Sequence, residues 1–354
     1  MKTTAQRWYI KFLQWKTQYL THRQFILLLC VLVGVATGFA ALAMRSLTHF
    51  IEEVLVGNII RYINYGFYVV FPAVGFLLVY LVKKYVIRKD VSHGIPSILY
   101  AVAKQKGIMK RFQAYGSLLT APITIGFGGS VGLEGPMVVT GAGISSQIAR
   151  LFHINQSDRM LLLACACAAA LAAIFKVPLA GILFAIEVFG LDLTLWSLLP
   201  LFVASLSGVL ISYLFFGNAA LLPIQVSGSF LMRNIPFYLL LGVVGGFMSA
   251  YFTFVYEWVN RFFARFSSPY VRLLIGGAVL GLLVFLMPPL YGEGHEVINH
   301  LKEGHPELSL GDNIFGWDLH NPWVIILLLA GLAFSKVVAT SVTFGAGGVG
   351  GIFS

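Results

Sequence analysis

The sequence predicts an all-α protein that crosses a membrane several times. Of its 354 residues, 58% are hydrophobic and 11% are charged, whereas soluble proteins contain about 25% charged residues. The mean hydropathy is +0.85, and several apolar runs are long enough to cross a bilayer as helices. This composition excludes a disordered chain and a disulfide scaffold, and it argues against a soluble enzyme. An outer-membrane barrel is excluded because its strands alternate apolar and polar residues.

The basic residues predict the orientation of the chain in the membrane. The net charge is +10, which we attribute to cytoplasmic flanks of the spans and not to nucleic-acid binding. Residues 1–23 combine five basic side chains with four Trp and Tyr residues and predict an amphipathic helix on the cytoplasmic face. A second basic cluster follows the apolar run 67–82. We therefore expect a multi-pass protein of the plasma or inner membrane with a cytoplasmic N-terminus.

The apolar runs alternate between clean spans and interrupted ones. Clean spans are expected at 24–44, 67–82, 197–216, 236–256, 271–287 and 322–340. The first contains Gly34 and Gly38, a spacing that lets two helices approach closely. The run 115–149 is broken by glycines in its middle, and the run 160–190 is expected to be cut at Pro178 and Gly181.

Three glycine-rich breaks, at 92–96, 126–136 and 345–351, carry the functional prediction. Broken helices are tolerated in a membrane only where they are buried in protein or line an aqueous path. Each break would place a helix N-terminus inside the membrane, where free N–H groups and the helix dipole attract anions. The breaks therefore indicate an intramembrane anion site of a transporter or channel. The alternative is that the glycines serve only close helix packing.

The motifs in these breaks resemble those of one family. They read SHGIP (Ser92–Pro96), GLEGP (Gly132–Pro136) and GGIFS (residues 350–354). Between them stand VPLAGILFAIE (Val177–Glu187) and the set Lys336, Thr340 and Thr343. Their kind and order resemble the CLC chloride channel and transporter family, whose signatures are GSGIP, G(K/R)EGP and GxFxP. The resemblance covers nearly the whole chain from about residue 24.

The resemblance implies a homodimer in which each subunit has its own anion pathway between two inverted repeats. On this basis we expect a first repeat at 24–216 and a second at 217–354, the second incomplete because Ser354 stands one residue before the family's proline. The substrate would be chloride or a similar anion, with protons as a possible second substrate. We expect no enzyme activity, no metal and no cofactor besides bound chloride.

The resemblance also assigns the site residues. Glu134 in GLEGP would be the gating glutamate, whose carboxylate competes with chloride and leaves when it is protonated. The anion-binding positions would be His93, Gly94, Ile95, Leu133, Glu134, Gly135, Pro136, Ile352 and Phe353. Most of them would act through backbone N–H groups. His93 departs from the family's serine: its imidazole could donate to chloride and make transport sensitive to pH, or the amides of Gly94 and Ile95 could take over its role.

A second departure concerns proton coupling. Coupled members often carry a second glutamate directly after the conserved one, and here Val188 follows Glu187. Valine cannot relay protons, so we lean towards a voltage- or pH-gated, channel-like anion pathway. The alternative is a proton/chloride antiporter that uses Glu134, and a fluoride-selective exporter is a third option. Glu187 itself would be structural, paired with a backbone N–H or with Lys176.

One segment imitates a metal site. It reads GHEVINH (Gly294–His300) and is followed by His305. Its two histidines are five residues apart, so they do not share one helix face as a zinc-binding HExxH pair does. We interpret the segment as a solvated loop and keep an intramembrane metalloprotease only as the alternative from another class.

Overall fold

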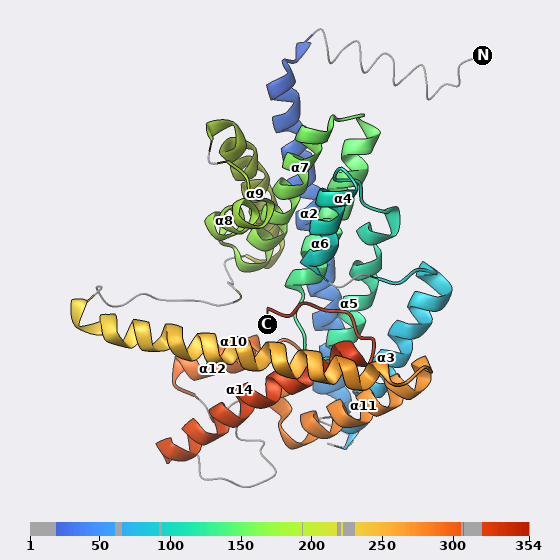
Figure 1. The fold of residues 1–354 in the computed structure, drawn as a ribbon, viewed down its shortest axis with the longest axis vertical. Helices are drawn as coiled ribbons and strands as arrows, with labels where there is room; N and C mark the ends of the chain where they lie inside the picture. The colour runs from blue at the N-terminus through green and yellow to red at the C-terminus, as the bar shows by residue number, and fades with distance from the viewer. Residues whose placement is uncertain are drawn as a thin grey trace. The chain divides into compact units, whose positions relative to one another are not determined.

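The computed structural model describes residues 19–60, 66–91, 94–192, 194–217, 221, 231–305, 307 and 321–353. Within these ranges the chain forms helices and no strand (Figure 1). Seven of the described helices are long and apolar enough to cross a membrane. The predicted all-α, multi-span fold is therefore confirmed, whereas most of the expected N-terminal amphipathic helix, residues 1–18, lies outside the described residues.

The chain divides into two compact units that interleave along the sequence. The first comprises Met1–Ala43, Gly94–Tyr115 and Met137–Asn218, and the second comprises Met44–His93, Gly116–Pro136 and Ala219–Ser354. Each unit thus draws segments from both sides of several breaks. The expected repeat boundary between residues 216 and 217 stays a prediction.

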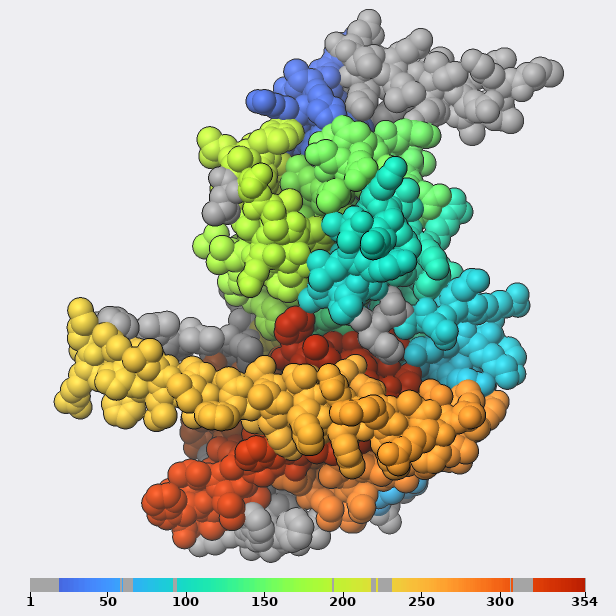
Figure 2. Space-filling view, viewed as in Figure 1, coloured from blue at the N-terminus to red at the C-terminus, as the bar shows by residue number. Residues whose placement is uncertain are grey.

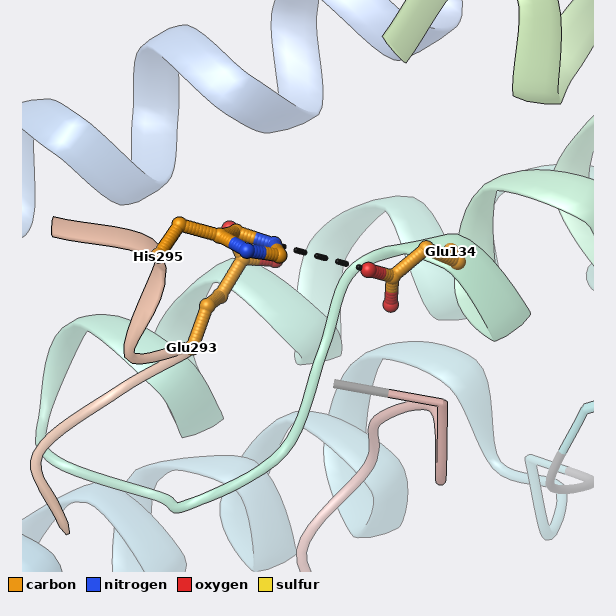
Figure 3. A group of neighbouring side chains, drawn as sticks. All are labelled: Glu134, Glu293 and His295. Carbon is orange, nitrogen blue, oxygen red and sulfur yellow. Dashed lines mark ion pairs between the residues drawn. The ribbon is translucent and has the colours of Figure 1, made fainter. Parts of the chain in front are cut away.

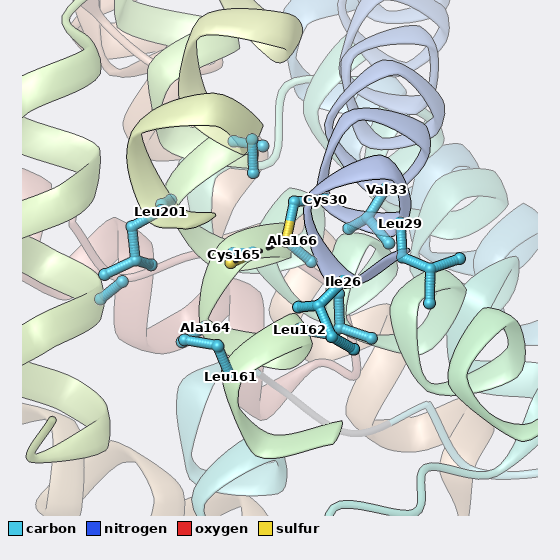
Figure 4. Close-up of a cluster of buried hydrophobic side chains, with 14 of the residues drawn as sticks. Ile26, Leu29, Cys30, Val33, Leu161, Leu162, Ala164, Cys165, Ala166 and Leu201 are labelled. Carbon is cyan, nitrogen blue, oxygen red and sulfur yellow. Dashed lines mark hydrogen bonds between the residues drawn. The ribbon is translucent and has the colours of Figure 1, made fainter. Parts of the chain in front are cut away.

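The first unit is built around α7 (Gln156–Phe175), an apolar helix whose residues are mostly buried. Its described helices are the N-terminal part of α2 (His22–Glu52), α4 (Ile95–Lys104), η3 (Arg111–Ala114), most of α6 (Glu134–Leu151), α7 (Gln156–Phe175), α8 (Pro178–Phe189) and α9 (Leu195–Phe216). The core joins Ile26 and Cys30 of α2 with Leu162 and Cys165 of α7 and Leu201 of α9 (Figure 4). The Sγ atoms of Cys30 and Cys165 are 3.7 Å apart, and both thiols are free and buried, as expected for small core residues.

Local sequence signals explain where α7 begins and ends. The Asn155 side chain accepts the N–H of Asp158 at 2.8 Å, which is an N-cap. The helix ends at Lys176 in a left-handed conformation, and α8 begins at Pro178 as predicted. The expected cut at Gly181 is wrong: Gly181 lies inside α8, where its missing side chain allows contact with the Ala168 carbonyl group of α7.

The second unit contains the end of α2 and the C-terminal helices. Its described helices are η1 (Glu53–Ile60), α3 (Phe67–Leu81), η2 (Val82–Ile87), α5 (Gly116–Gly126), η4 (Met232–Asn234), α10 (Ile235–Ala264), α11 (Pro269–Leu286), η5 (Pro288–Leu290), α12 (His295–Glu303) and α14 (Pro322–Gly345). Phe76 of α3, Leu280 and Val284 of α11 and Val342 of α14 meet in its core. Helix α10 is exposed along most of its length (Figure 2).

Several spans are longer than predicted; α10, for example, ends at Ala264 and not at residue 256. The first span was expected at 24–44, but its helix runs from His22 to Gly57. An uninterrupted apolar helix at Gln156–Phe175 replaces the first half of the expected broken run 160–190. The central break was predicted correctly, because α5 ends at Gly126 and α6 begins at Glu134.

The small-residue spacing at Gly34 generates a stability prediction. A Cβ atom at Gly34 would collide with the Ala204 carbonyl oxygen and lie 2.9 Å from Ser207 Cβ, whereas one at Gly242 of α10 would meet nothing within 4 Å. We expect Gly34→Ala to lower the free energy of unfolding by about 1–3 kcal/mol through overpacking. Gly242→Ala is the control and should leave stability equal or higher, because alanine favours helix by about 1 kcal/mol. Thermal unfolding of the detergent-solubilised protein measures both, and equal midpoints for Gly34→Ala and wild type would contradict the packing argument.

Candidate anion and proton site

The site in the second unit centres on the N-terminus of α6. Glu134 is the first residue of this helix, and its side chain is 4% exposed. The helix dipole and the free N–H groups of the first turn favour a negative charge at this position. The predicted break thus leads directly into a helix that begins with a buried carboxylate.

The loop that precedes Glu134 turns at a glycine packed against an aromatic ring. Gly128 has a φ of +91°, and a Cβ atom there would lie 2.8 Å from the Tyr291 ring. The Tyr291 hydroxyl group donates to the carbonyl oxygen of Gly126, the last residue of α5. A left-handed turn this close to a ring requires glycine.

The GLEGP and GGIFS motifs, far apart in sequence, are joined by their backbones. The Gly132 N–H donates to the Gly351 carbonyl oxygen at 3.0 Å, and the Gly351 N–H donates to the Gly132 carbonyl oxygen at 2.7 Å. A Cβ atom at Gly135 would lie 3.0 Å from Gly351 Cα. The glycines therefore allow two non-helical segments to satisfy each other's hydrogen-bonding groups.

One face of α14 holds the loops of the site in place. Thr340 Oγ1 donates to the Ser130 carbonyl oxygen at 2.8 Å, and Thr343 Oγ1 accepts the Ser130 N–H at 3.2 Å. Lys336 Nζ donates to the Gly292 carbonyl oxygen at 2.8 Å. Residues 336, 340 and 343 follow helical spacing, so they share a face. The motif resemblance had singled out these three residues, and in the structure they hydrogen-bond to the loops of the site.

Two further titratable side chains lie beside Glu134 (Figure 3). His295 Nε2, at the start of α12, is 3.6 Å from Glu134 Oε1 and 3.8 Å from Glu293 Oε2. The side chains of His295 and Glu293 are 11% and 19% exposed. The imidazole therefore stands between two largely buried carboxylates.

Glu293 binds the backbone directly before the gate position. The Leu133 N–H donates to Glu293 Oε1 at 2.7 Å, and such a hydrogen bond is stronger when the carboxylate is charged. From the family resemblance, this amide was expected to bind an anion. In this structure a carboxylate oxygen from the same chain takes that position.

The surroundings of Glu293 favour its protonated form. Burial raises the pKa of the Glu293 carboxyl group, and the charge of Glu134 raises it further. His295, the Leu133 N–H and Lys336 act in the opposite direction. The net shift is upward, so Glu293 takes up a proton at a higher pH than an exposed glutamate does.

Positive charge around the two carboxylates comes from Lys336 and Arg45. Lys336 interacts electrostatically with both Glu134 and Glu293, and Arg45 of α2 interacts with Glu293. The metal-binding atoms of Glu134, Glu293 and His295 lie within 4.8 Å of one another, a spacing that a divalent cation could accept. Because Lys336 and Arg45 already supply positive charge near the two carboxylates, we assign no metal to this group.

The remaining predicted anion ligands fall in different places. Gly94 is the N-cap of α4, with a φ of +66°, and Ile95 is the first residue of that helix. Both belong to the first unit, and His93 lies outside the described residues. Gly135 and Pro136 follow Glu134 in the first turn of α6.

The last two predicted ligands follow the backbone bridge. The side chains of Ile352 and Phe353 are 50% and 63% exposed. The anion-binding assignments of all these positions stay predictions.

The coupling position and its neighbour lie on α8. Glu187 is exposed and Val188 is half-buried. Lys176, which we had considered as a partner of Glu187, donates to the carbonyl oxygens of Phe216 and Gly217 and lies 4.9 Å from the centre of the Tyr213 ring. The structural role of Glu187 stays a prediction.

Sequence reasoning missed Glu293 and His295. The expected solvated loop is wrong for this segment, because His295–Glu303 forms α12 and its first side chain is largely buried beside Glu134. A signal was present: Glu293 stands between two glycines directly after an apolar span, as Glu134 stands between Leu133 and a glycine in GLEGP. Nothing local indicates that the two segments meet.

Two known proteins are similar to the chain over most of its length. The chain is 27% identical over 341 residues to a putative chloride channel protein ClcB-like of Ralstonia nicotianae, covering 91% of this chain and 74% of the relative. It is 26% identical over 343 residues to the H(+)/Cl(-) exchange transporter ClcA of Salmonella arizonae, covering 93% and 68%.

Solved structures share the fold. A slow cyanobacterial Cl-/H+ antiporter matches with a TM-score of 0.75 at 20% identity, covering 94% of this chain and 76% of that one. A CLC-type fluoride/proton antiporter matches with a TM-score of 0.71 at 22% identity, covering 94% and 78%. Residues 74–354 match the model of the family described as voltage gated chloride channel. On this match, which spans most of the chain, the protein belongs to the CLC family of chloride channels and transporters.

Proposed function

We propose that the protein exchanges chloride for protons across the membrane. Glu134 is the group that takes up the proton and competes with chloride. The observation that carries the proposal is the buried carboxylate of Glu134 at the first position of α6. When it is charged, this carboxylate occupies the positive end of the helix and repels chloride. When it is protonated, the carboxyl group is uncharged and is no longer attracted to the helix N-terminus, so chloride can replace it. One residue thereby links the two ions.

Proton coupling is favoured over the channel-like pathway that Val188 had suggested. Relatives that match more than nine-tenths of this chain include H(+)/Cl(-) exchange transporters. Val188 is a single position, and it indicates only that one proton-relay group is missing there. A fluoride-selective exporter stays an alternative, since the match to the fluoride/proton antiporter establishes only a shared fold.

The setting of the protein is part of the same proposal. We place it as a homodimer in the inner membrane with its N-terminus in the cytoplasm. The bacterial relatives support this membrane, the basic flanks support the orientation, and the dimer rests on the family resemblance. Membership of a family of transporters also favours transport over the metalloprotease alternative.

Glu134→Gln tests the gate. Glutamine keeps the shape of the side chain but cannot bind and release a proton, so the variant should conduct chloride without moving protons uphill. In liposomes with a chloride gradient at about pH 7.5, where an ordinary glutamate is ionised, the wild type should drive proton movement in a fixed ratio to chloride and the variant should drive none. Glu257→Gln, at an exposed ion-paired site on α10, is the control and should behave as wild type.

Two outcomes would contradict the proposal. Uphill proton movement that persists in Glu134→Gln would remove Glu134 from the coupling. Chloride flux without linked protons in the wild type would instead restore the channel-like interpretation from Val188.

His93→Ser tests whether the imidazole contributes to anion binding. An imidazole ordinarily gains its proton below a pH of about 6.5, so a histidine ligand should bind chloride more tightly in acid. Calorimetric titration with chloride, performed in the Glu134→Gln background so that Glu134 does not titrate, should show a pH-dependent affinity that His93→Ser reduces. If the serine variant binds with the same affinity and the same pH dependence, backbone amides carry this position.

A further inference from the structure

The contact between Glu293 and the backbone before Glu134 points to a second gate. We propose that the Glu293 carboxylate occupies the anion-binding N–H group of Leu133 and yields it to chloride when Glu293 is protonated. The inference rests on the proposed function, because it assumes that chloride passes the N-terminus of α6. It assigns gating to two carboxylates, Glu134 and Glu293, which lie close together beside His295.

The contact is of the kind that a chloride ion would make. A carboxylate oxygen at 2.7 Å from the Leu133 nitrogen sits at the positive end of α6. Amides at a helix N-terminus bind inorganic anions and carboxylates alike. While Glu293 is charged, chloride must displace a tethered anion to reach this amide.

The backbone of Glu293 is anchored while its carboxylate remains within reach of solvent. Lys336 Nζ donates to the carbonyl oxygens of Gly292 and Glu293 at 2.8 and 3.3 Å. The side chain of Glu293 is 19% exposed, against 4% for Glu134. A rotation of the side chain alone can therefore release the amide, and a proton can reach the carboxylate without passing Glu134.

The direction of the pH response follows from the charged neighbours of Glu293. The groups that act on it from the surrounding elements are Glu134, His295, Lys336, Arg45 and Glu52. The carboxylates oppose a second negative charge, and the cationic groups stabilise it. Two carboxylates this close bind protons as a coupled pair. As pH falls, Glu293 becomes neutral, its charge-assisted hold on Leu133 weakens, and chloride flux should rise.

A merely structural role predicts a different result. Glu293 could serve only to cap α6, because a side-chain oxygen that accepts an N–H of the first turn satisfies the helix end. Glu293→Gln separates the two roles: the amide oxygen can still accept the Leu133 N–H, but the negative charge and the proton are gone. The control is Glu296→Gln, which removes one exposed negative charge from the same segment.

The decisive comparison is made in the Glu134→Gln background, where Glu134 no longer titrates. The protein is reconstituted in liposomes, and chloride efflux is measured from about pH 7.5 down to about pH 4.5, the range over which glutamates with ordinary or raised pKa gain their protons. Glu134→Gln alone should keep an efflux that rises several-fold towards acid. The double variant with Glu293→Gln should lose most of this rise and keep the higher rate at neutral pH, and the double variant with Glu296→Gln should still rise.

The outcomes separate this inference from the proposed function. An unchanged profile on adding Glu293→Gln, or an already flat profile in Glu134→Gln alone, would overturn the second gate. Glu134→Gln that still pumps protons would overturn the first assignment instead. If the double variant fails to fold, Glu293→Asp is measured in its place: it keeps the charge but shortens the side chain, and wild-type flux at neutral pH would also overturn the proposal.

Discussion

The backbone pairing of Gly132 with Gly351 is the constraint on which the site depends. In a bilayer, a non-helical segment must satisfy its N–H and carbonyl groups within the protein. Here two such segments satisfy each other through two hydrogen bonds, and glycine at positions 135 and 351 allows their backbones to touch. The pairing fixes the peptide of Leu133 and the start of α6. The position of the Glu134 carboxylate at the positive end of the α6 dipole therefore depends on this pairing.

The charge states of Glu134 and Glu293 would determine whether the proposed site accepts an anion. Glu134 and Glu293 lie beside one imidazole and interact with Lys336. With both carboxylates charged, chloride would meet repulsion as well as the occupied amide of Leu133. With one or both protonated, the helix end and the Lys336 ammonium group leave a positive field that favours an anion. On the proposed mechanism, protonation converts the same residues from a closed site to a receptive one.

The sequence predicted the parts of the structure that have local causes. Composition gave the membrane fold, glycine clusters located the break between α5 and α6, and Pro178 marked the start of α8. Gly181 failed as a break because a glycine next to a close-packed carbonyl group serves contact and not a turn. Glu293 and His295 could not be placed, since their role depends on a contact between residues 133 and 293 that no periodicity encodes.

The absence of a carboxylate at Val188 does not by itself decide between a channel and an exchanger. Exchange requires that the proton and the anion exclude each other at one place, so that each turnover moves both. On the proposed mechanism, a negatively charged Glu134 or Glu293 at the α6 terminus excludes chloride, and a bound chloride favours the protonated, displaced carboxyl group. This mutual exclusion is a property of the anion site. A relay at residue 188 would change how fast protons reach the site, while the linkage itself depends on the carboxylates that flank Leu133.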